Sequence, residues 1–283
     1  MIYYIGIDLG TSAMKGILTD ERGKIARQAS ATYDVIYPQN GWTEQNPSDW
    51  IVALNKVLAE LLCMDKDCGA CGACGCATVN SQSIAKYVKG ISFGGQMHGL
   101  VALDKHGEVI RPCILWNDGR TEKQTAYLNE VVCKQTLSEL TGNIAFAGFT
   151  APKLLWMREN EPENFARIDK IMLPKDYLAY YLSGVVATDY SDASGTLLLD
   201  VKNKRWSQKM ANVCGISLQN LPELHESYDV IGTVKHDVAA RFGMPDNVKV
   251  VIGAGDNAAA AIGTGTVNDG DCNVSLGTSG TIF

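Results

Sequence analysis

The chain has 283 residues, a formal net charge of −6 at neutral pH and 46% hydrophobic residues, which is typical of a soluble globular protein of one or two domains. The acidic balance and the lack of a dense lysine and arginine run argue against nucleic acid or an anionic membrane as the main partner. Polar residues or glycine interrupt every apolar run before it could span a membrane, and the first residues carry no basic leader, so we expect a cytoplasmic protein.

The first 33 residues predict a three-stranded antiparallel meander with two tight turns. The expected strands cover residues 2–8, 14–19 and 25–33. Gly10, Thr11 and Ser12 place backbone N–H groups and hydroxyls in a row in the first turn, and a carboxylate, Asp8, stands just before them. Such a turn can hold phosphate oxygens while the carboxylate holds Mg²⁺ through water, because this ion keeps much of its hydration shell. An ordinary hairpin with polar turn residues is the alternative.

A helix is expected to begin near residue 47. Asn46 can cap its first turn, and Pro47 is favoured at the first helical position. Apolar side chains at helical spacing mark the face that should be buried: Trp50, Leu54, Val57, Leu58 and Leu61.

The nine cysteines form an odd total in a chain without a secretory signal, which favours reduced thiols or metal ligands over a disulfide framework. Five of them cluster after the helix, at Cys63, Cys68, Cys71, Cys74 and Cys76. Thiols at this spacing on a glycine-rich loop can converge on a tetrahedral metal or an iron–sulfur cluster, and a solvent-facing insertion is the alternative. The isolated cysteines are expected to be small core residues: Cys113, Cys133, Cys214 and Cys272.

A strand over residues 87–93 leads into a pair of glycines, which points to a cleft at its end. Gln96 and His98 can form hydrogen bonds with hydroxyl groups of a ligand, and Met97 can lie against an apolar carbon face. A histidine with a purely structural role is equally compatible with this position.

A further strand over residues 114–116 carries polar residues at its end. Asp118 could face a ligand, whereas a salt-bridged turn explains Arg120 better. Helices should begin at residues 150–152 and at residues 173–176. The segment 189–196 is too polar and too small for a core and is expected to line or support a cleft.

The stretch from residue 248 to residue 260 organises the rest of the chain. Residues 248–252 predict a buried strand, and Gly253 and Gly255 allow a sharp turn and close approach of a ligand. Asp256 therefore sits at the end of a strand, where ligands bind in open α/β proteins and where a general base would stand. The alternative is that Asp256 only caps the helix that begins near Asn257.

The first turn has a counterpart near residue 280. Residues 272–283 again consist of an apolar strand, a turn with a glycine, a threonine and a serine, and a second apolar segment. The turn of this second hairpin comprises Gly277, Thr278 and Ser279. Two phosphate-type hairpins suggest a duplicated fold that holds a nucleotide from two sides, and chance similarity is the alternative.

These motifs together resemble the FGGY carbohydrate kinase family, within the actin and hexokinase superfamily. The motifs that carry the resemblance are residues 5–12, 253–258 and 276–280. Five further stretches are most similar to the xylulokinases of that family, namely residues 94–99, 115–120, 148–154, 173–177 and 191–196. The resemblance implies an α/β fold of the ribonuclease H-like type, with a mixed sheet flanked by helices.

The resemblance also implies a reaction, in which MgATP phosphorylates the primary hydroxyl of a ketopentose and D-xylulose becomes D-xylulose 5-phosphate. Asp256 would accept the hydroxyl proton and Asp8 would hold Mg²⁺. The ATP phosphates would face both hairpin turns, Gly10, Thr11 and Ser12 with Gly277, Thr278 and Ser279. The sugar would contact Gln96, Met97, His98, Trp116, Asp118 and Asn257. The partners would then be the sugar and MgATP, with a homodimer as a further possibility.

Two features depart from the family pattern. Family members are about twice this length, so we expect residues 1–253 to form the sugar-binding domain and residues 254–283 to begin a truncated nucleotide-binding domain. We expect the chain alone to be inactive. The cysteine loop is also foreign to the pattern, which leaves two alternatives open: a kinase for another sugar or polyol, or an ATPase or activase of the superfamily with a cysteine-bound cluster.

Overall fold

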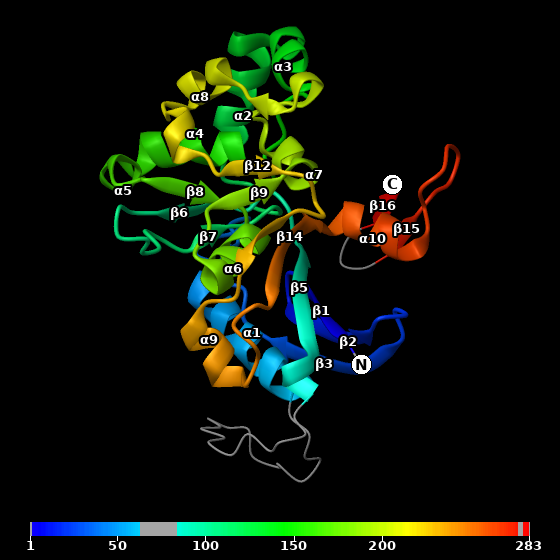
Figure 1. Ribbon diagram of the computed structural model, residues 1–283. Helices are drawn as coiled ribbons and strands as arrows, with labels where there is room; N and C mark the ends of the chain where they lie inside the picture. Colours follow the sequence, from blue (N-terminus) through cyan, green and yellow to red (C-terminus); the bar gives the residue numbers. More distant parts are fainter. Residues whose placement is uncertain (1, 63–83, 277–279, 283) are drawn as a thin grey trace.

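The computed structural model describes residues 2–62, 84–276 and 280–282 (Figure 1). The cysteine loop, including Cys63 and Cys68–Cys76, and the second hairpin turn at Gly277, Thr278 and Ser279 lie outside the described residues. The predictions made for them are therefore not addressed by the structure.

A six-stranded mixed sheet forms the first lobe, with the strand order β13-β14-β5-β1-β2-β3. Its strands are β1 (Tyr3–Leu9), β2 (Ala13–Asp20), β3 (Ile25–Thr32), β5 (Val88–Gly95), β13 (Val230–Thr233) and β14 (Lys249–Gly255). β1, β2 and β3 form the predicted antiparallel meander, whereas β5 runs parallel to both β1 and β14. The predicted α/β class with a mixed sheet is confirmed.

Alternation along β1 separates the two faces of this sheet. Ile5, Ile7 and Leu9 are buried on one face, while Gly6 and Asp8 point to the other. Three helices cover the buried face (Figure 1): α1 (Pro47–Leu62), α6 (Pro174–Ser183) and α9 (His236–Phe242).

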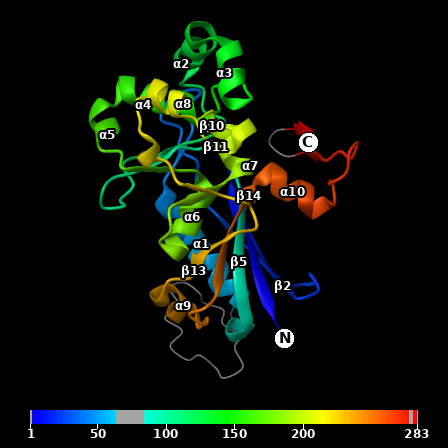
Figure 2. The ribbon, with the colours of Figure 1, turned by 45° about the horizontal axis from the view of Figure 1, so that its top comes forward.

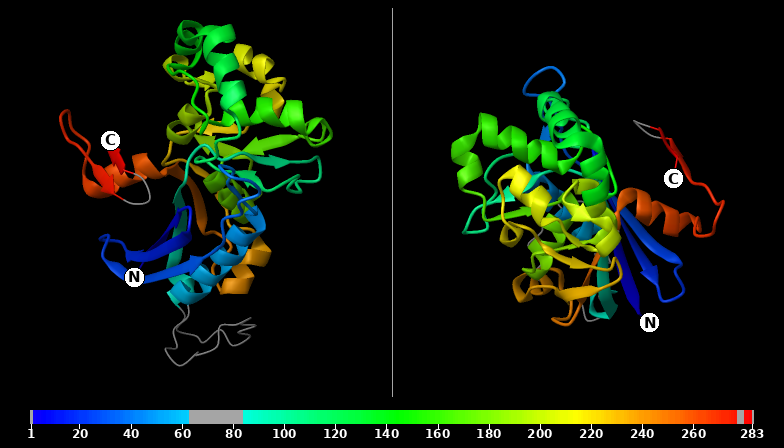
Figure 3. Two further views of the ribbon diagram at one scale, coloured as in Figure 1. Left: turned by 180° about the vertical axis from the view of Figure 1, so that it is seen from behind. Right: turned by 90° about the horizontal axis from the view of Figure 1, so that it is seen from above.

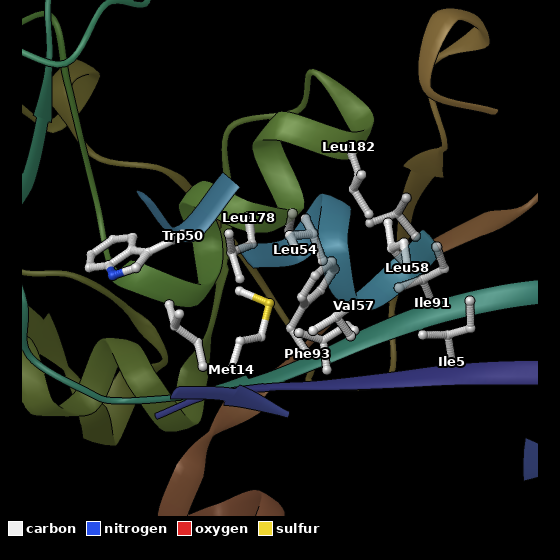
Figure 4. Close-up of a cluster of buried hydrophobic side chains, with 14 of the residues drawn as sticks. Ile5, Met14, Trp50, Leu54, Val57, Leu58, Ile91, Phe93, Leu178 and Leu182 are labelled. Carbon is white, nitrogen blue, oxygen red and sulfur yellow. The ribbon is translucent and has the colours of Figure 1, made fainter. Parts of the chain in front are cut away.

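The core between sheet and helices follows the expected pattern. All five predicted apolar positions of α1 are fully buried: Trp50, Leu54, Val57, Leu58 and Leu61. Figure 4 labels the first four of them, packed over β1, β2 and β5. Each such side chain contributes about 1.5–3 kcal/mol of burial free energy, so this stripe anchors the sheet from which the site is built.

The second lobe consists of two-stranded ribbons and short helices above the sheet (Figure 1). The ribbons pair β4 (Glu44–Gln45) with β7 (Cys113–Ile114), β6 (Val101–Leu103) with β8 (Lys170–Met172), β9 (Ala187–Asp189) with β12 (Glu223–His225), and β10 (Leu199–Asp200) with β11 (Arg205–Trp206). The helices are α2 (Glu122–Tyr127), α3 (Lys134–Thr141), α4 (Thr150–Asn160), α5 (Pro162–Ala166), α7 (Tyr190–Ala193) and α8 (Gln208–Cys214). The strand predicted over residues 114–116 is thus only the short β7, and it pairs with β4 rather than with the main sheet.

Several predictions about burial need correction. Cys113 and Cys214 are buried as expected, but Cys133 and Cys272 are exposed. Cys133 has a positive φ of 82° where a helix is interrupted before α3, so its side chain turns away from the core. The segment 189–196 is largely buried despite its polarity, because a buried lysine faces its carboxylates.

The last described residues form an arm that leaves the two lobes. It consists of α10 (Asp256–Thr264) followed by β15 (Val274–Leu276) and β16 (Gly280–Ile282), and both views of Figure 3 place it to one side. β15 and β16 pair antiparallel, as the predicted second hairpin requires. Within the described part of the chain, every helix is too short or too polar to cross a bilayer.

Candidate active site

Three neighbouring parallel strands end at one edge of the sheet and bring distant parts of the chain together. Asp8 pairs with Gly94 between β1 and β5, and Gly95 pairs with Gly255 between β5 and β14. Asp256 follows β14 directly, at the start of α10 (Figure 2). A cavity of about 650 Å³ opens at this edge, and Asp8, Gly10, Lys15, Asp256 and Asn257 are among its lining residues.

The turn that carries Asp256 has an unusual backbone. The pairing of β14 with β5 is interrupted between Val251 and Ala254, and Gly253 within this bulge has a φ of +76°. A Cβ at Gly253 would lie 1.8 Å from the carbonyl oxygen of Phe93, so only glycine fits. The bulge turns the end of β14 toward the cavity.

Asp256 combines features of a helix terminus and of a base. Its Oδ1 accepts a hydrogen bond of 2.8 Å from the N–H of Asn257, in the first turn of α10. Desolvation raises the pKa of Asp256, the Asn257 N–H lowers it, and the nearby Asp8 carboxylate raises it again, with a net rise. A carboxylate with a raised pKa is a stronger proton acceptor than an ordinary one, which suits a general base.

Asp8 lies on the open face of the sheet, next to a lysine and a tyrosine. Desolvation raises the pKa of Asp8, and the Lys15 ammonium lowers it in part. The hydroxyl of Tyr33 donates a short hydrogen bond to the carbonyl of Gly10. Desolvation and the Asp8 charge both raise the pKa of Tyr33, so its hydroxyl stays protonated and continues to hold the turn.

A network of side-chain hydrogen bonds holds the first hairpin turn in place. The indole N–H of Trp116 donates to the Thr11 hydroxyl at 3.0 Å, and that hydroxyl lies 3.4 Å from Oε1 of Gln96. Gln45 donates to the Thr11 carbonyl at 2.6 Å. The Thr11 hydroxyl is therefore engaged within the protein, whereas Ser12 is exposed.

The same network holds Gln96. Its amide nitrogen donates to Oε1 of Gln45 at 2.9 Å, and that oxygen also accepts the indole N–H of Trp50 at 3.1 Å. Gln96 is buried, with 2% of its surface exposed. Both ends of its amide thus serve to join the hairpin turn to α1 and to the end of β5.

Met97 lies against the turn that carries Asp256. A Cβ at Gly255 would approach Sδ, Cγ and Cε of Met97 to 3.0 Å, and Nδ2 of Asn257 lies 3.9 Å from the same sulfur. The structure therefore places Met97 and Asn257, two predicted ligand contacts, side by side next to Asp256.

His98 is held in a strained conformation. Its φ of 69° lies in the left-handed region, and its carbonyl accepts hydrogen bonds of 3.0 Å from both Thr150 and Lys153. Its Nδ1 lies 2.9 Å from the carbonyl oxygen of Gly195, and its ring centroid lies 4.8 Å from that of Phe149.

The surroundings of His98 also define its charge. Desolvation and the charge of Lys153 lower the pKa of His98 to about 4, although the Gly195 carbonyl raises it. The ring is therefore neutral near pH 7. Because a carbonyl oxygen can only accept, Nδ1 carries the proton and Nε2 is left as a hydrogen-bond acceptor.

Asp118 does not face the cavity. Its carboxylate accepts bonds from the Arg120 guanidinium at 2.7 and 2.8 Å and from the Thr43 N–H at 2.6 Å, and 2% of the residue is exposed. Arg120 in turn stacks on Trp42, with 4.0 Å from its Cζ to the ring centroid. The geometry gives Asp118 a structural role and does not support its predicted contact with a ligand.

Residues 3–263 match the FGGY family of carbohydrate kinases, N-terminal domain. The chain belongs to this family. A xylulose kinase from Lactococcus lactis is 46% identical over 282 residues, which cover all of this chain and 53% of the relative. The resemblance inferred from the motifs is thereby confirmed.

Solved structures of FGGY kinases share the fold. A xylulose kinase from Rhodospirillum rubrum is 28% identical with a TM-score of 0.88, and a gluconate kinase from Lactobacillus acidophilus is 27% identical with a TM-score of 0.87. Each comparison covers 99% of this chain and 54% or 53% of the other chain. This FGGY chain thus spans about half the length of the relatives it matches.

Sequence reasoning missed two sets of residues that support the FGGY site. Gln45 connects three buried groups, and Lys175 is fully buried beside the carboxylates of residues 189 and 192. The only signal for Lys175 was its place in a helix start, where an exposed lysine is the usual expectation.

Proposed function

We propose that this chain contributes the sugar-binding side of an ATP-dependent kinase that phosphorylates the primary hydroxyl of a ketopentose, with D-xylulose as the acceptor. The observation that carries the proposal is the convergence of Asp8, Met97 and Asp256 at the ends of three adjacent strands. The names of the relatives support the choice of sugar, since the similar proteins from Lactococcus lactis and Rhodospirillum rubrum are xylulose kinases.

In this proposal Asp256 accepts the proton of the attacking hydroxyl as the oxygen bonds to the γ-phosphorus of ATP and ADP departs. Positioning and charge neutralisation dominate such transfers, and one general base contributes about 10²–10⁴-fold. The raised pKa of Asp256 and its place in the cavity suit this role. The exposed turn with Gly10, Thr11 and Ser12 would face the phosphates through its backbone and the Ser12 hydroxyl.

The sugar would lie against Met97 and accept or donate hydrogen bonds at His98 and Asn257. Nε2 of neutral His98 is an acceptor for a sugar hydroxyl, and the amide of Asn257 can bind another. Trp116 and Gln96 would act indirectly, by holding Thr11 and the turn in place through hydrogen bonds.

The donor set also fits a divalent cation of the Mg²⁺ type. Asp8 and Asp256 are oxygen donors that line one cavity, and the Asp8 charge raises the pKa of Asp256, so a cation would be stabilised there. Asp8 would hold it, through water, where it would neutralise charge on the phosphate oxygens.

We further propose that residues 1–253 form the sugar-binding domain and that residues 254–283 begin a nucleotide-binding domain. In support, β15 and β16 form a ribbon of their own outside the six-stranded sheet. The second turn, Gly277, Thr278 and Ser279, would then also bind the phosphates. The reaction would take place in the cytoplasm, which holds the ATP that it needs.

Two measurements test the proposal. A thermal-shift panel of D-xylulose, D-ribulose, gluconate and glycerol should show the largest rise in melting temperature with D-xylulose, since a ligand of the native state stabilises it. In a full-length kinase made by completing this chain with the remaining part of the Lactococcus lactis relative, Asp256→Asn should lower kcat by about 10²-fold or more with little change in sugar binding. No stabilisation by any ketose would refute the substrate class, and an active Asp256→Asn variant would refute the base.

A further inference from the structure

A buried charge cluster lies behind the turn that carries Asp256. The ammonium of Lys175 is 2.6 Å from Oδ1 of Asp176, 2.9 Å from Oδ1 of Asp189 and 3.7 Å from Oδ2 of Asp192. All four side chains are fully buried, and none of them lines the cavity at Asp8. Burying charges costs several kcal/mol unless they are well paired, so a cluster of this kind calls for an explanation beyond stability.

One member of the cluster accepts hydrogen bonds from two serines. Oδ2 of Asp189 accepts the hydroxyl of Ser191 at 2.5 Å and its N–H at 2.9 Å, and it accepts the hydroxyl of Ser227 at 2.7 Å. Burial alone would raise the pKa of Asp189, but the Lys175 ammonium and the serine donors outweigh it and hold that pKa below its usual value. Asp189 is therefore a carboxylate, the form that can accept all of these bonds.

The two serines hold the bulged turn from both sides. The hydroxyl oxygen of Ser191 accepts the N–H of Gly255 at 3.1 Å. The carbonyl oxygen of Ser227 accepts the N–H of Gly253 at 3.1 Å. Asp189 is thus linked to Gly255 through Ser191 and to Gly253 through Ser227.

Apart from its pairing with β5, the turn has no side chains at Gly253 and Gly255 to restrain it, and glycine tolerates many backbone conformations. Displacement of a reacting group by about 1 Å can cost about 10²-fold in rate. A turn built on two glycines therefore needs an external support if its carboxylate is to stay in place.

We propose that Asp189, kept ionised by Lys175, is a positioning residue that clamps the turn through Ser191 and Ser227 and so sets the location of the Asp256 carboxylate. This inference rests on the proposed function of Asp256 as the base. Asp192 completes the cluster: burial raises its pKa well above the usual value, the Lys175 ammonium lowers it in part, and the charges of Asp176, Asp189 and Asp256 raise it further.

The test compares two serines that make the same number of side-chain hydrogen bonds. Ser191→Ala removes the hydroxyl bond to Asp189 and the acceptor for the Gly255 N–H, while the backbone N–H of residue 191 can still donate to Asp189. Ser183→Ala, the matched control, removes a donor to the Ala179 carbonyl and an acceptor for the Val185 N–H at the end of α6, away from the turn. Ser191→Thr keeps the hydroxyl and should therefore behave as the wild type does.

The first readout needs neither sugar nor ATP. Amide hydrogen exchange of Gly255, measured by NMR on this chain, should be at least about 10-fold faster in Ser191→Ala than in the wild type, and unchanged in Ser183→Ala and Ser191→Thr. Equal exchange rates in Ser191→Ala and the wild type would overturn the clamp, whatever the chain does with a ketose.

The second readout is kinetic and uses the completed full-length kinase. Ser191→Ala should lower kcat by about 10–100-fold while KM for the ketose changes less than about threefold, and Ser183→Ala should leave both constants unchanged. If the two alanine variants have the same kcat, the clamp does not serve Asp256. If the wild-type kinase lacks ketose activity but Gly255 exchange responds to Ser191→Ala, the proposed function fails and the clamp on the turn stands.

Discussion

Acidification should destabilise this chain through His98, and the effect has a defined size. The pKa of His98 falls from an ordinary 6.5 to about 4 on folding, because the ring is desolvated and Lys153 lies nearby. Above pH 6.5 the ring is neutral in both the folded and unfolded states. As the pH falls from 6.5 to about 4, the unfolded state binds a proton that the folded state does not, so the unfolding free energy decreases. The full difference corresponds to about 3 kcal/mol.

The measurement is urea unfolding at pH 7.5 and 4.5 for the wild type and for His98→Asn, since asparagine tolerates the left-handed backbone at this position. Carboxylates that titrate in this range are common to both proteins, so their effects cancel in the comparison. The wild type should lose about 2 kcal/mol more than His98→Asn between the two pH values. His236→Asn, at a histidine with 82% of its side chain exposed, is the control and should follow the wild type. Equal losses in the wild type and His98→Asn would refute the neutral, desolvated imidazole.

Two substitutions probe the supports of the site. A Cβ at Gly195 would lie 2.3 Å from Cε1 of His98, so Gly195→Ala should displace the ring and weaken ketose binding by about 10-fold or more, as measured by calorimetric titration. Gly263→Ala, where a Cβ meets open space, should bind as the wild type does. Gln45→Leu leaves three hydrogen-bonding groups, two of them buried, without their partner and should lower the unfolding free energy by about 2–4 kcal/mol. The exposed Gln219→Leu should change it by less than about 0.5 kcal/mol, and similar values for both variants would contradict the network.

Local patterns were enough for the parts of the fold that depend on neighbours in the sequence. Short apolar runs separated by two turn sequences predicted the meander in residues 2–33, because both the strands and the tight turns leave local signals. The stripe on α1 predicted its buried face for the same reason. Glycines at the ends of β5 and β14 marked the strand ends where Met97 and Asp256 lie, because a sharp turn at a strand end leaves its own signal.

Pairings between distant residues left no such signal. Asp118 was predicted to contact a ligand. Only the tertiary structure brings the Arg120 guanidinium and the Thr43 N–H to its carboxylate. The polarity of segment 189–196 argued against a place in the core, since no local pattern shows that Lys175 will pair with its carboxylates inside the protein. A charged residue is read as exposed until its partner is known.

The bulge at Gly253 has a consequence for how the position of Asp256 can change. Because the backbone of Phe93 leaves no room for any side chain at Gly253, a substitution at this position cannot adjust the reach of the Asp256 carboxylate without displacing β5. Variation near His98 is less constrained, because its neighbour there is a side chain, the Phe149 ring with its centroid 4.8 Å away, and not backbone. Under the proposed function, the position of the base and the surroundings of the sugar would therefore depend on different segments of the same chain.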